Sequence, residues 1–529
     1  MSGYWKKSSS IRRRTVVLSL ACSGLLLLFL FHDHMLQSQD KPIPVPVTPP
    51  QSPSPGSLLP GQHQHQRQYH VSPHLQLYYH EDDADITSVD LSSPRAPFIA
   101  WPLRRVCAET TYVPGLTFVC DNNSGGPGNI RNYILTCVRY AIDAGATGLV
   151  LPRIRARSPD DASNLFRNHR PFGYMFDEPH FRAALAAACP RVAVFSTLDD
   201  VPGARDPDLA AVREGRPGAR GAERLVERVT PKDFGGRRAG CDARDPNRHT
   251  DRFGPAFRAW LRETAAERGW TDTPPSGVKG KELGIPRIIR FSWGVLWDWP
   301  THRDGPELAA TFGGLLRFRA DVLDIADAVA EAMRGTARRL AVPEDPDRAA
   351  ASVARGRFLG VHLRSEADAL ARWPSYANQT QAYLGEAARR GFRGGAAYLA
   401  SGDAGEAARF AREAGAALGL AVRTKFDLLD AAEEEGGGGA GVLARQLRAL
   451  SWDQQALVDF AVLLQCDYFV GVSPSSFSVN VALRRHLRDE GLLARPWRVG
   501  GPGDGRSWLV GRWDRYWDDW LFMFDGMWP

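Results

Sequence analysis

The decapeptide LGVHLRSEAD spans residues 359–368 and contains the most sharply defined strand ending in the sequence. Its apolar first half predicts a buried strand, which stops at the polar residues His362 and Arg364. Open α/β sheets bind ligands at the carboxyl ends of their strands. The pattern therefore predicts an imidazole and a guanidinium at a sheet edge, next to an anionic substrate. The His-x-Arg spacing recurs at residues 65, 180 and 486, so a surface pair after an ordinary strand is the alternative.

Length and composition limit the number of domains and the kinds of binding partner. A chain of 529 residues with 43% hydrophobic residues is long enough for two or three domains and a large core. The net charge of +6 fits an anionic ligand, a membrane surface or a nucleic acid. Because the basic residues are spread out and no aromatic-basic nucleic-acid motif occurs, we expect no nucleic-acid partner.

The N-terminal part has the pattern of a membrane anchor. Residues 15–31 form an uncharged apolar run preceded by Lys6, Lys7 and three arginines, which predicts a transmembrane signal anchor behind a cytosolic tail at residues 1–14. A cleaved signal is the alternative, but no small-x-small site follows the run. Residues 32–94 are rich in Pro, Gln, Ser and His and predict a disordered stem. We therefore expect a single-pass type II protein of the Golgi or endoplasmic reticulum, with its catalytic part lumenal.

Six cysteines follow the predicted anchor, at positions 107, 120, 137, 189, 241 and 466. An even number in an oxidising lumen permits disulfides, whose pairing the sequence leaves open. No CxxC pair occurs, so we expect no zinc site. Asn122 and Asn378 begin sequons for N-glycosylation.

A β-loop-α-β unit is predicted near the start of the globular part. The strand at residues 116–120 leads into the loop DNNSGGPG at 121–128, and apolar residues at helical spacing follow from 130 to 142. The loop glycines Gly126 and Gly128 would place free helix amides where they can hold an oxyanion. A dinucleotide site is not expected, because the third glycine of GxGxxG is missing and the next strand ends in arginines.

The second half of the chain returns to a βα rhythm. We expect a long helix at residues 442–465, a strand at 466–472, a turn at 473–476 and a helix at 477–490, whereas residues 205–280 predict loops. Two alternating α/β runs predict two doubly wound domains, at residues 95–365 and 366–529. The active site would be the cleft between them.

Two features of this second half suggest a nucleotide. The turn VSPSSFSVN at residues 472–480 joins a strand to a helix, so the hydroxyls of Ser475 and Ser476 and the first helix amides would face one point, as suits a diphosphate. An ordinary Ser N-cap is the alternative. Asp459, on the preceding helix, has a carboxylate that can accept two hydrogen bonds from guanine, although a solvated helix aspartate is the default expectation.

The segments SGGPGNIR (124–131), LGVHLRSEAD (359–368) and LVDFAVLLQCDYFVGVSPSSFSVN (457–480) occur in this order and widely spaced. Together they resemble the motifs of the GDP-fucose protein O-fucosyltransferase family, in outline over residues 96–500. The resemblance implies two Rossmann-like domains in a GT-B arrangement. It also implies GDP-fucose as the donor substrate, inversion at the anomeric carbon, and no metal or other cofactor.

The same resemblance implies roles for single residues. Arg364 would bind the β-phosphate and stabilise the departing GDP, and Asn129 would face the reacting centre. The other implied contacts are nucleotide-binding or supporting ones: His362, Asp459, Ser475, Ser476, Phe477, Gly126, Gly128 and Arg131. At the position of Gly126 one branch of the family has an arginine and another a glutamate base. Deprotonation would then fall to the leaving phosphate, to Asp121 or to another residue.

Taken together, the resemblance implies a metal-independent inverting glycosyltransferase. It would move fucose from GDP-fucose to a Ser/Thr hydroxyl of a protein or to a glycan. One alternative is a non-catalytic GDP-sugar or glycan-binding protein with the same fold. A metal-dependent transferase is disfavoured, because the motif Asp83-Ala84-Asp85 lies in or beside the predicted stem.

Overall fold

The computed structural model describes residues 86–158, 168–205, 221–230, 250–267, 287–292, 296–340, 356–366, 373–434, 438–490, 498–511 and 521–529. All of these belong to one compact unit, Ser72–Pro529. The predicted anchor and nearly all of the predicted stem lie outside these residues. Within the ranges given, no helix has the length and apolar character needed to cross a bilayer.

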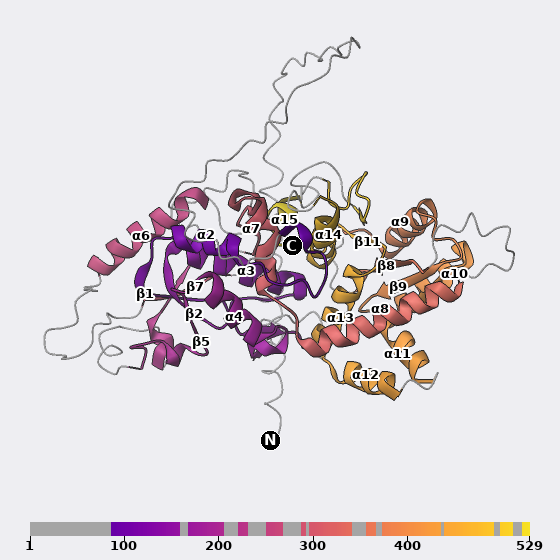
Figure 1. Cartoon of the computed structure of the whole chain (residues 1–529), viewed down its shortest axis with the longest axis horizontal. Coiled ribbons are helices and arrows are strands. Elements are labelled where there is room, and N and C mark those ends of the chain that lie inside the picture. Colours follow the sequence, from indigo (N-terminus) through magenta and orange to yellow (C-terminus); the bar gives the residue numbers. More distant parts are fainter. Residues whose placement is uncertain are drawn as a thin grey trace, which may run out of the picture. The chain divides into compact units, whose positions relative to one another are not determined.

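The first half of the unit contains a five-stranded parallel sheet (Figure 1). In chain order its strands are β1 (Val113–Val119), β2 (Ala146–Val150), β5 (Ala193–Phe195), β6 (Val226–Val229) and β7 (Arg287–Phe291), arranged as β5-β2-β1-β7-β6. Every neighbouring pair is parallel. The order reverses between β1 and β7, so the loops that follow these two strands border a ligand crevice.

The second half contains another five-stranded parallel sheet. It consists of β8 (Phe358–His362), β9 (Ala396–Ala400), β10 (Ala421–Arg423), β11 (Tyr468–Val472) and β12 (Ser507–Val510), in the Rossmann-like order β10-β9-β8-β11-β12. Its neighbouring pairs are also parallel. The predicted class, α/β with two parallel-sheet halves, is confirmed. The predicted boundary at residue 365 is wrong for β8, because this strand forms its hydrogen bonds with β9 and β11.

Helices cover both sheets. They are α2 (Trp101–Glu109), α3 (Pro127–Ala144), α4 (Glu178–Ala188), α6 (Thr250–Glu267), α7 (Pro306–Thr311), α8 (Ala320–Leu340), α9 (Tyr376–Arg389), α10 (Ala404–Leu418), α11 (Lys425–Glu434), α12 (Gly438–Ala449), α13 (Trp452–Leu464), α14 (Ser476–Glu490) and α15 (Leu521–Asp525). A short antiparallel hairpin, β3 (Ile154–Ala156) and β4 (Asn168–Arg170), follows β2. Single 3₁₀ turns lie at Ile86–Ser88, Phe172–Tyr174, Leu198–Asp200, Gly221–Leu225, Thr301–Asp304 and Phe312–Leu315.

Three predicted segments differ from the structure. The single helix expected at residues 442–465 is two helices, because Ser451 forms a capping box with Gln454 and starts α13 anew. Residues 205–280, expected to be loops, contribute β6 and α6. The end of the predicted stem is ordered: Ser92 is buried, and Arg95 just beyond it pairs with two aspartates of α8 at 2.6 Å.

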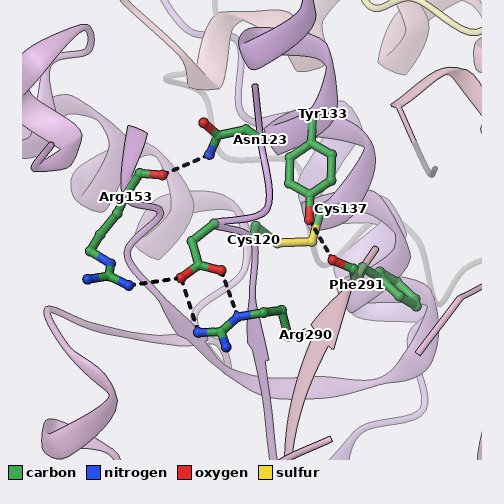
Figure 2. The surroundings of a disulfide bond; sticks show 8 residues. Cys120, Asn123, Tyr133, Cys137, Arg153, Arg290 and Phe291 are labelled. Atoms are coloured by element: carbon green, nitrogen blue, oxygen red, sulfur yellow. Dashed lines mark hydrogen bonds and ion pairs between the residues drawn. A yellow bond between two sulfur atoms is a disulfide. The ribbon is translucent and has the colours of Figure 1, made fainter. Parts of the chain in front are cut away.

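Helix α3 is the central element of the first half. Pro127 starts it at a position where a missing N–H costs nothing, and Gly145 ends it in the left-handed conformation with φ of 87°. The disulfide Cys120–Cys137 ties its middle turn to the end of β1, and Figure 2 shows this bond beside Tyr133 and Arg290. A second disulfide joins Cys107 to Cys189. Because the loop at 121–128 is held at both ends, its glycines have a fixed place.

Candidate functional site

A cavity of about 980 Å³ lies at the carboxyl edges of both sheets. From the first half it is lined by Gly126, Pro127, Asn129, Arg157 and Trp297. From the second half its lining includes His362, Arg364, Glu366, Lys425, Asp459, Ser475, Ser476 and Phe477. Residues more than 300 positions apart in the sequence thus share one concave surface. Its volume suits a nucleotide sugar, since ligand pockets commonly span roughly 300–1,000 Å³.

The first turns of α3 and α14 meet at this cavity. A Cβ on Gly128 would lie 2.7 Å from the carbonyl oxygen of Ser476, so the two helices can approach this closely only with glycine there. Gly128 is therefore a packing residue and is not among those that line the cavity. Gly125 has φ of 95°, and the Asn129 amide lies over it, 2.7 Å from the place of a Cβ. The loop thus presents Gly126 and Asn129 to the cavity, while Gly128 faces α14.

Arg364 is held from two directions. Its backbone N–H donates to Gln379 at 3.0 Å, and Gln379 donates back to the carbonyl of Arg364 at 2.8 Å. Its guanidinium is paired with Glu366, whose other oxygen accepts from the N–H of Gly402 at 2.8 Å. The side chain lies over Trp373, with 5.6 Å from the guanidinium carbon to the ring centre. The cation is thereby fixed at the cavity wall, as a phosphate clamp requires.

His362 is a buried neutral base rather than a surface cation. Its ring packs 4.5 Å from that of Phe477, and Nδ1 lies 2.6 Å from the hydroxyl of Ser478. Burial, reinforced by the charge of Arg364, lowers the pKa of His362 to about 3. The imidazole therefore stays uncharged at physiological pH and can serve only as a hydrogen-bonding and stacking group.

Asp459 lies in the wall of the cavity, at the centre of a small polar network. Its two carboxylate oxygens accept separate hydrogen bonds, from the Tyr398 hydroxyl at 2.5 Å and from Lys425 Nζ at 2.7 Å. Burial, with the neighbouring carboxylate second, raises the pKa of Tyr398 well above its usual value, so its hydroxyl stays a donor. Sequence reasoning missed both partners. The rule that found His362 applies to Lys425 as well, because Lys425 follows β10 at the same sheet edge.

The turn between β11 and α14 has the predicted form. The N–H of Ser475 donates to Val472 at 3.2 Å, and its carbonyl accepts from Val479 at 2.9 Å, which starts α14. Ser475, Ser476 and Phe477 all line the cavity. This helix N-terminus lies at the point between β8 and β11 where the strand order reverses. A helix N-terminus there favours an anion.

The placement predicted for Arg131 is wrong. Its side chain is only 1% exposed and donates to the carbonyl of Trp528 at 2.6 Å and to Pro529 at 2.5 Å, away from the cavity. Burial, with the charge of Arg484 second, lowers its pKa well below the usual value. The reason is helical geometry: residues two positions apart point to nearly opposite faces, so Asn129 and Arg131 do not share a surface.

Asp121 does not face the cavity either. Arg290 clamps both of its carboxylate oxygens at 2.7 and 3.1 Å, and Arg153 approaches one of them at 3.5 Å (Figure 2). The carboxylates that do line the cavity are Glu366, Asp427 and Asp459, as far as the described residues go. Over the same residues, no three His, Cys, Asp or Glu side chains gather as a metal ion would need. Because Arg290 holds both of its oxygens and it does not line the cavity, Asp121 is a structural acid.

Comparison with known proteins gives one match at the level of family. The family model described as GDP-fucose protein O-fucosyltransferase matches residues 116–390. No curated protein sequence matches significantly.

Three solved structures with a similar course of the chain are POFUT1, NodZ and FUT1. POFUT1 in complex with GDP-fucose is 14% identical, covers 76% of this chain and 99% of its own, and has a TM-score of 0.38. NodZ from Bradyrhizobium is 14% identical over 70% of this chain and 93% of its own, with a TM-score of 0.33. A mutant of Arabidopsis thaliana FUT1 in complex with GDP is 12% identical, covers 73% of this chain and 71% of its own, and has a TM-score of 0.34.

Proposed function

Because the chain belongs to the GDP-fucose protein O-fucosyltransferase family, we propose that it transfers fucose from GDP-fucose to a hydroxyl group, with inversion at the anomeric carbon and without a metal ion. The acceptor would be a Ser/Thr hydroxyl of a protein or a hydroxyl of a glycan. The proposed domain arrangement is GT-B, with the donor bound mainly by the second, Rossmann-like half.

The observation that carries this proposal is the convergence of three distant motifs on one cavity. The loop after β1 brings Asn129, the end of β8 brings Arg364, and the turn after β11 brings Ser475. A diphosphate placed among them would meet a fixed guanidinium and a helix N-terminus. Both stabilise negative charge, which is the main electrostatic requirement of this reaction.

In the proposed reaction the acceptor oxygen attacks the anomeric carbon while the bond from that carbon to the β-phosphate oxygen breaks. The electron pair of the broken bond leaves with GDP, where Arg364 stabilises the growing charge. The acceptor proton passes to the departing phosphate, because Asp121, the acid named from the sequence, is held by Arg290 outside the cavity. Asn129 would orient the acceptor or the sugar beside the reacting carbon.

The pairing of Arg364 with Glu366 fits this role. Glu366 holds the guanidinium in place without a ligand, and a β-phosphate would share or replace that contact. A bidentate phosphate contact needs the planar fork of arginine, so lysine would substitute poorly.

The test uses Arg364→Ala and Arg364→Lys, with Arg409→Ala as the matched control. Arg409 lies on α10, and its side chain is 54% exposed. We expect kcat for transfer from GDP-fucose to fall about 100- to 1,000-fold in both Arg364 variants, in line with the loss of one transition-state stabilising group, and to stay unchanged in the control. Unaltered product formation by Arg364→Ala would remove the assignment.

A second candidate is a non-catalytic GDP-sugar or glycan-binding protein. The observation in its favour is that each carboxylate in the described cavity lining, Glu366, Asp427 and Asp459, already accepts hydrogen bonds from the protein, so none stands apart as a base for the acceptor hydroxyl. Calorimetric binding of GDP-fucose by a protein that forms no product over many hours with protein and glycan acceptors would favour this candidate.

We also propose that the protein is a type II membrane protein of the Golgi or endoplasmic reticulum. The two disulfides support a lumenal location, because such bonds persist in oxidising compartments. Protease protection of the C-terminal part in sealed microsomes tests the topology, and digestion without detergent would contradict it.

A further inference from the structure

Lys425 gives the cavity a feature that the transfer reaction does not need. Its side chain is 8% exposed, lies at the start of α11 and lines the cavity beside Asp459. It is also the only lysine in the part of the chain that the structure describes, whereas arginines are abundant there. A lysine at this one position therefore calls for a specific explanation.

Several buried or half-buried acids elsewhere in the described residues are paired with arginine. Arg290 donates to both oxygens of Asp121, and Arg139 donates to both oxygens of Asp304. Glu386 is paired with Arg389 and Arg390. A guanidinium fork of this kind occupies a carboxylate on both oxygens. An ammonium group is a point donor and occupies only one position. Lysine at 425 thus pairs with Asp459 without closing it to a ligand.

Asp459 and Lys425 both keep hydrogen-bonding positions that a ligand can use. A carboxylate offers about four acceptor positions, and Asp459 uses two, one for Tyr398 and one for Lys425. The ammonium group has three N–H donors, of which one goes to Asp459. The cavity wall therefore presents the remaining N–H donors of Lys425 next to the remaining acceptor positions of Asp459. The Nζ atom of Lys425 lies 2.7 Å from the carboxylate oxygen of Asp459.

Guanine has the complementary edge, with the O6 acceptor beside the N1–H and N2–H donors, whereas adenine carries an amino donor in place of O6. We infer that Lys425 donates to O6 of guanine while Asp459 accepts from N1 and N2, so that Lys425 determines selectivity for guanine over adenine nucleotides. This inference rests on the proposed function, in which a GDP-sugar occupies the cavity. It assigns Lys425 as a specificity residue and leaves Arg364 as the phosphate contact.

The experiment measures the affinities of GDP, IDP and ADP by calorimetry for the wild type, Lys425→Met and Asp430→Asn. The ratio of IDP to ADP affinity reports the 6-position together with N1, which carries a hydrogen in IDP and none in ADP, and the ratio of GDP to IDP affinity reports the 2-amino group. Because the contact of Asp459 with N1 is present in both proteins, a change of the IDP to ADP ratio between wild type and Lys425→Met reports the 6-position. For Lys425→Met we expect the IDP to ADP preference to fall about tenfold to a hundredfold, as a lost charged hydrogen bond implies, while the GDP to IDP preference stays. Asp430 lies on the same helix, pairs with Arg448 outside the cavity, and should give wild-type ratios.

An equal loss of affinity for all three nucleotides in Lys425→Met would overturn the inference, because it would mean that Lys425 only neutralises Asp459. A second measurement needs no variant: the wild type should bind 2,6-diaminopurine riboside diphosphate, which has an amino group in place of O6 and no hydrogen on N1, at least about tenfold more weakly than GDP. Equal affinity would also overturn it. A wild type that does not prefer GDP to ADP or UDP would instead contradict the proposed function itself.

Discussion

At the scale of single residues, His362 makes the stability of the fold depend on pH. The pKa of His362 is lowered to about 3 because burial and the charge of Arg364 disfavour the imidazolium form. In the unfolded chain an ordinary histidine titrates near pH 6.5. Below that pH the unfolded state binds a proton that the folded state refuses, so stability from this residue is present above pH 6.5 and is lost as the pH falls towards 3.

We predict that His362→Asn flattens the acid side of the stability profile. Between about pH 6 and pH 4 the free energy of unfolding of the wild type should fall relative to the variant by roughly 1.4 kcal/mol per pH unit. Urea unfolding at several pH values measures this. The lost hydrogen bond to Ser478 adds a constant offset and leaves the slope unaffected. Parallel profiles for the two proteins would show that His362 titrates normally.

Residue-scale prediction from the sequence succeeded where a strand end decided the outcome. His362 ends β8, and Arg364 and Ser475 lie just after β8 and β11 of the same parallel sheet, so their convergence follows from the fold class alone. Arg131 was misplaced because a loop motif was extended into a helix without regard to which face each residue takes. Lys425 was missed because its meaning depends on Asp459, 34 residues away, and no local pattern encodes that pair.

At the scale of elements, the contact between the first turns of α3 and α14 sets the geometry of the cavity. Gly128 of α3 lies against the backbone of Ser476, the first residue of α14. These two turns carry Asn129 and Ser476, both of which line the cavity. The width of the cavity at this point therefore depends on the absence of a side chain at residue 128.

We predict that Gly128→Ala destabilises the protein by about 1–3 kcal/mol, because a methyl group would lie 2.7 Å from a backbone oxygen that cannot move alone. Transfer activity should fall as well. The control is Gly385→Ala on α9, where no atom lies within 4 Å of the new methyl group. That change should be neutral or stabilising by up to about 1 kcal/mol, since alanine favours helix. Similar thermal unfolding of both variants would contradict the close contact.

The helices and strands themselves were largely predictable, with errors that have local causes. The helical spacing noted at residues 130–142 lies within α3 over Pro127–Ala144, because Pro127 suits its first turn and Gly145 ends it in the left-handed conformation. The break between α12 and α13 was hidden, since residues 442–465 keep helical spacing across it and only the cap at Ser451 interrupts it. A capping residue inside a run of helical spacing can therefore end one helix and begin another.

At the scale of the whole molecule, residues 526–529 connect α3 with α14. The side chain of Asn132 on α3 donates to Gly526 at 2.8 Å and accepts from the N–H of Trp528 at 2.9 Å. Asn480 on α14 donates to the carbonyl of Trp528 at 2.8 Å. The ring of Trp528 is fully buried and packs 4.6 Å from that of Phe312. This segment helps to hold the two halves in the register that forms the cavity.

We predict that Trp528→Ala lowers the free energy of unfolding by about 3–5 kcal/mol, the usual loss for a buried tryptophan. It should also weaken GDP binding, although Trp528 does not line the cavity. Leu340→Ala is the control, because Leu340 is 44% exposed and its removal should change stability by no more than about 0.5 kcal/mol. Denaturant unfolding and GDP titration of both variants provide the data. Unweakened GDP binding by a destabilised Trp528→Ala would separate this segment from the cavity.

The central claim is that three stretches far apart in the sequence form one nucleotide site, and hydrogen–deuterium exchange with and without GDP tests it most directly. We predict that GDP slows exchange in all three of the segments at residues 124–131, 360–366 and 473–480, while helix α4, which contributes no residue to the cavity lining, is unaffected. Protection confined to one of the three segments, or absent from all of them, would contradict it.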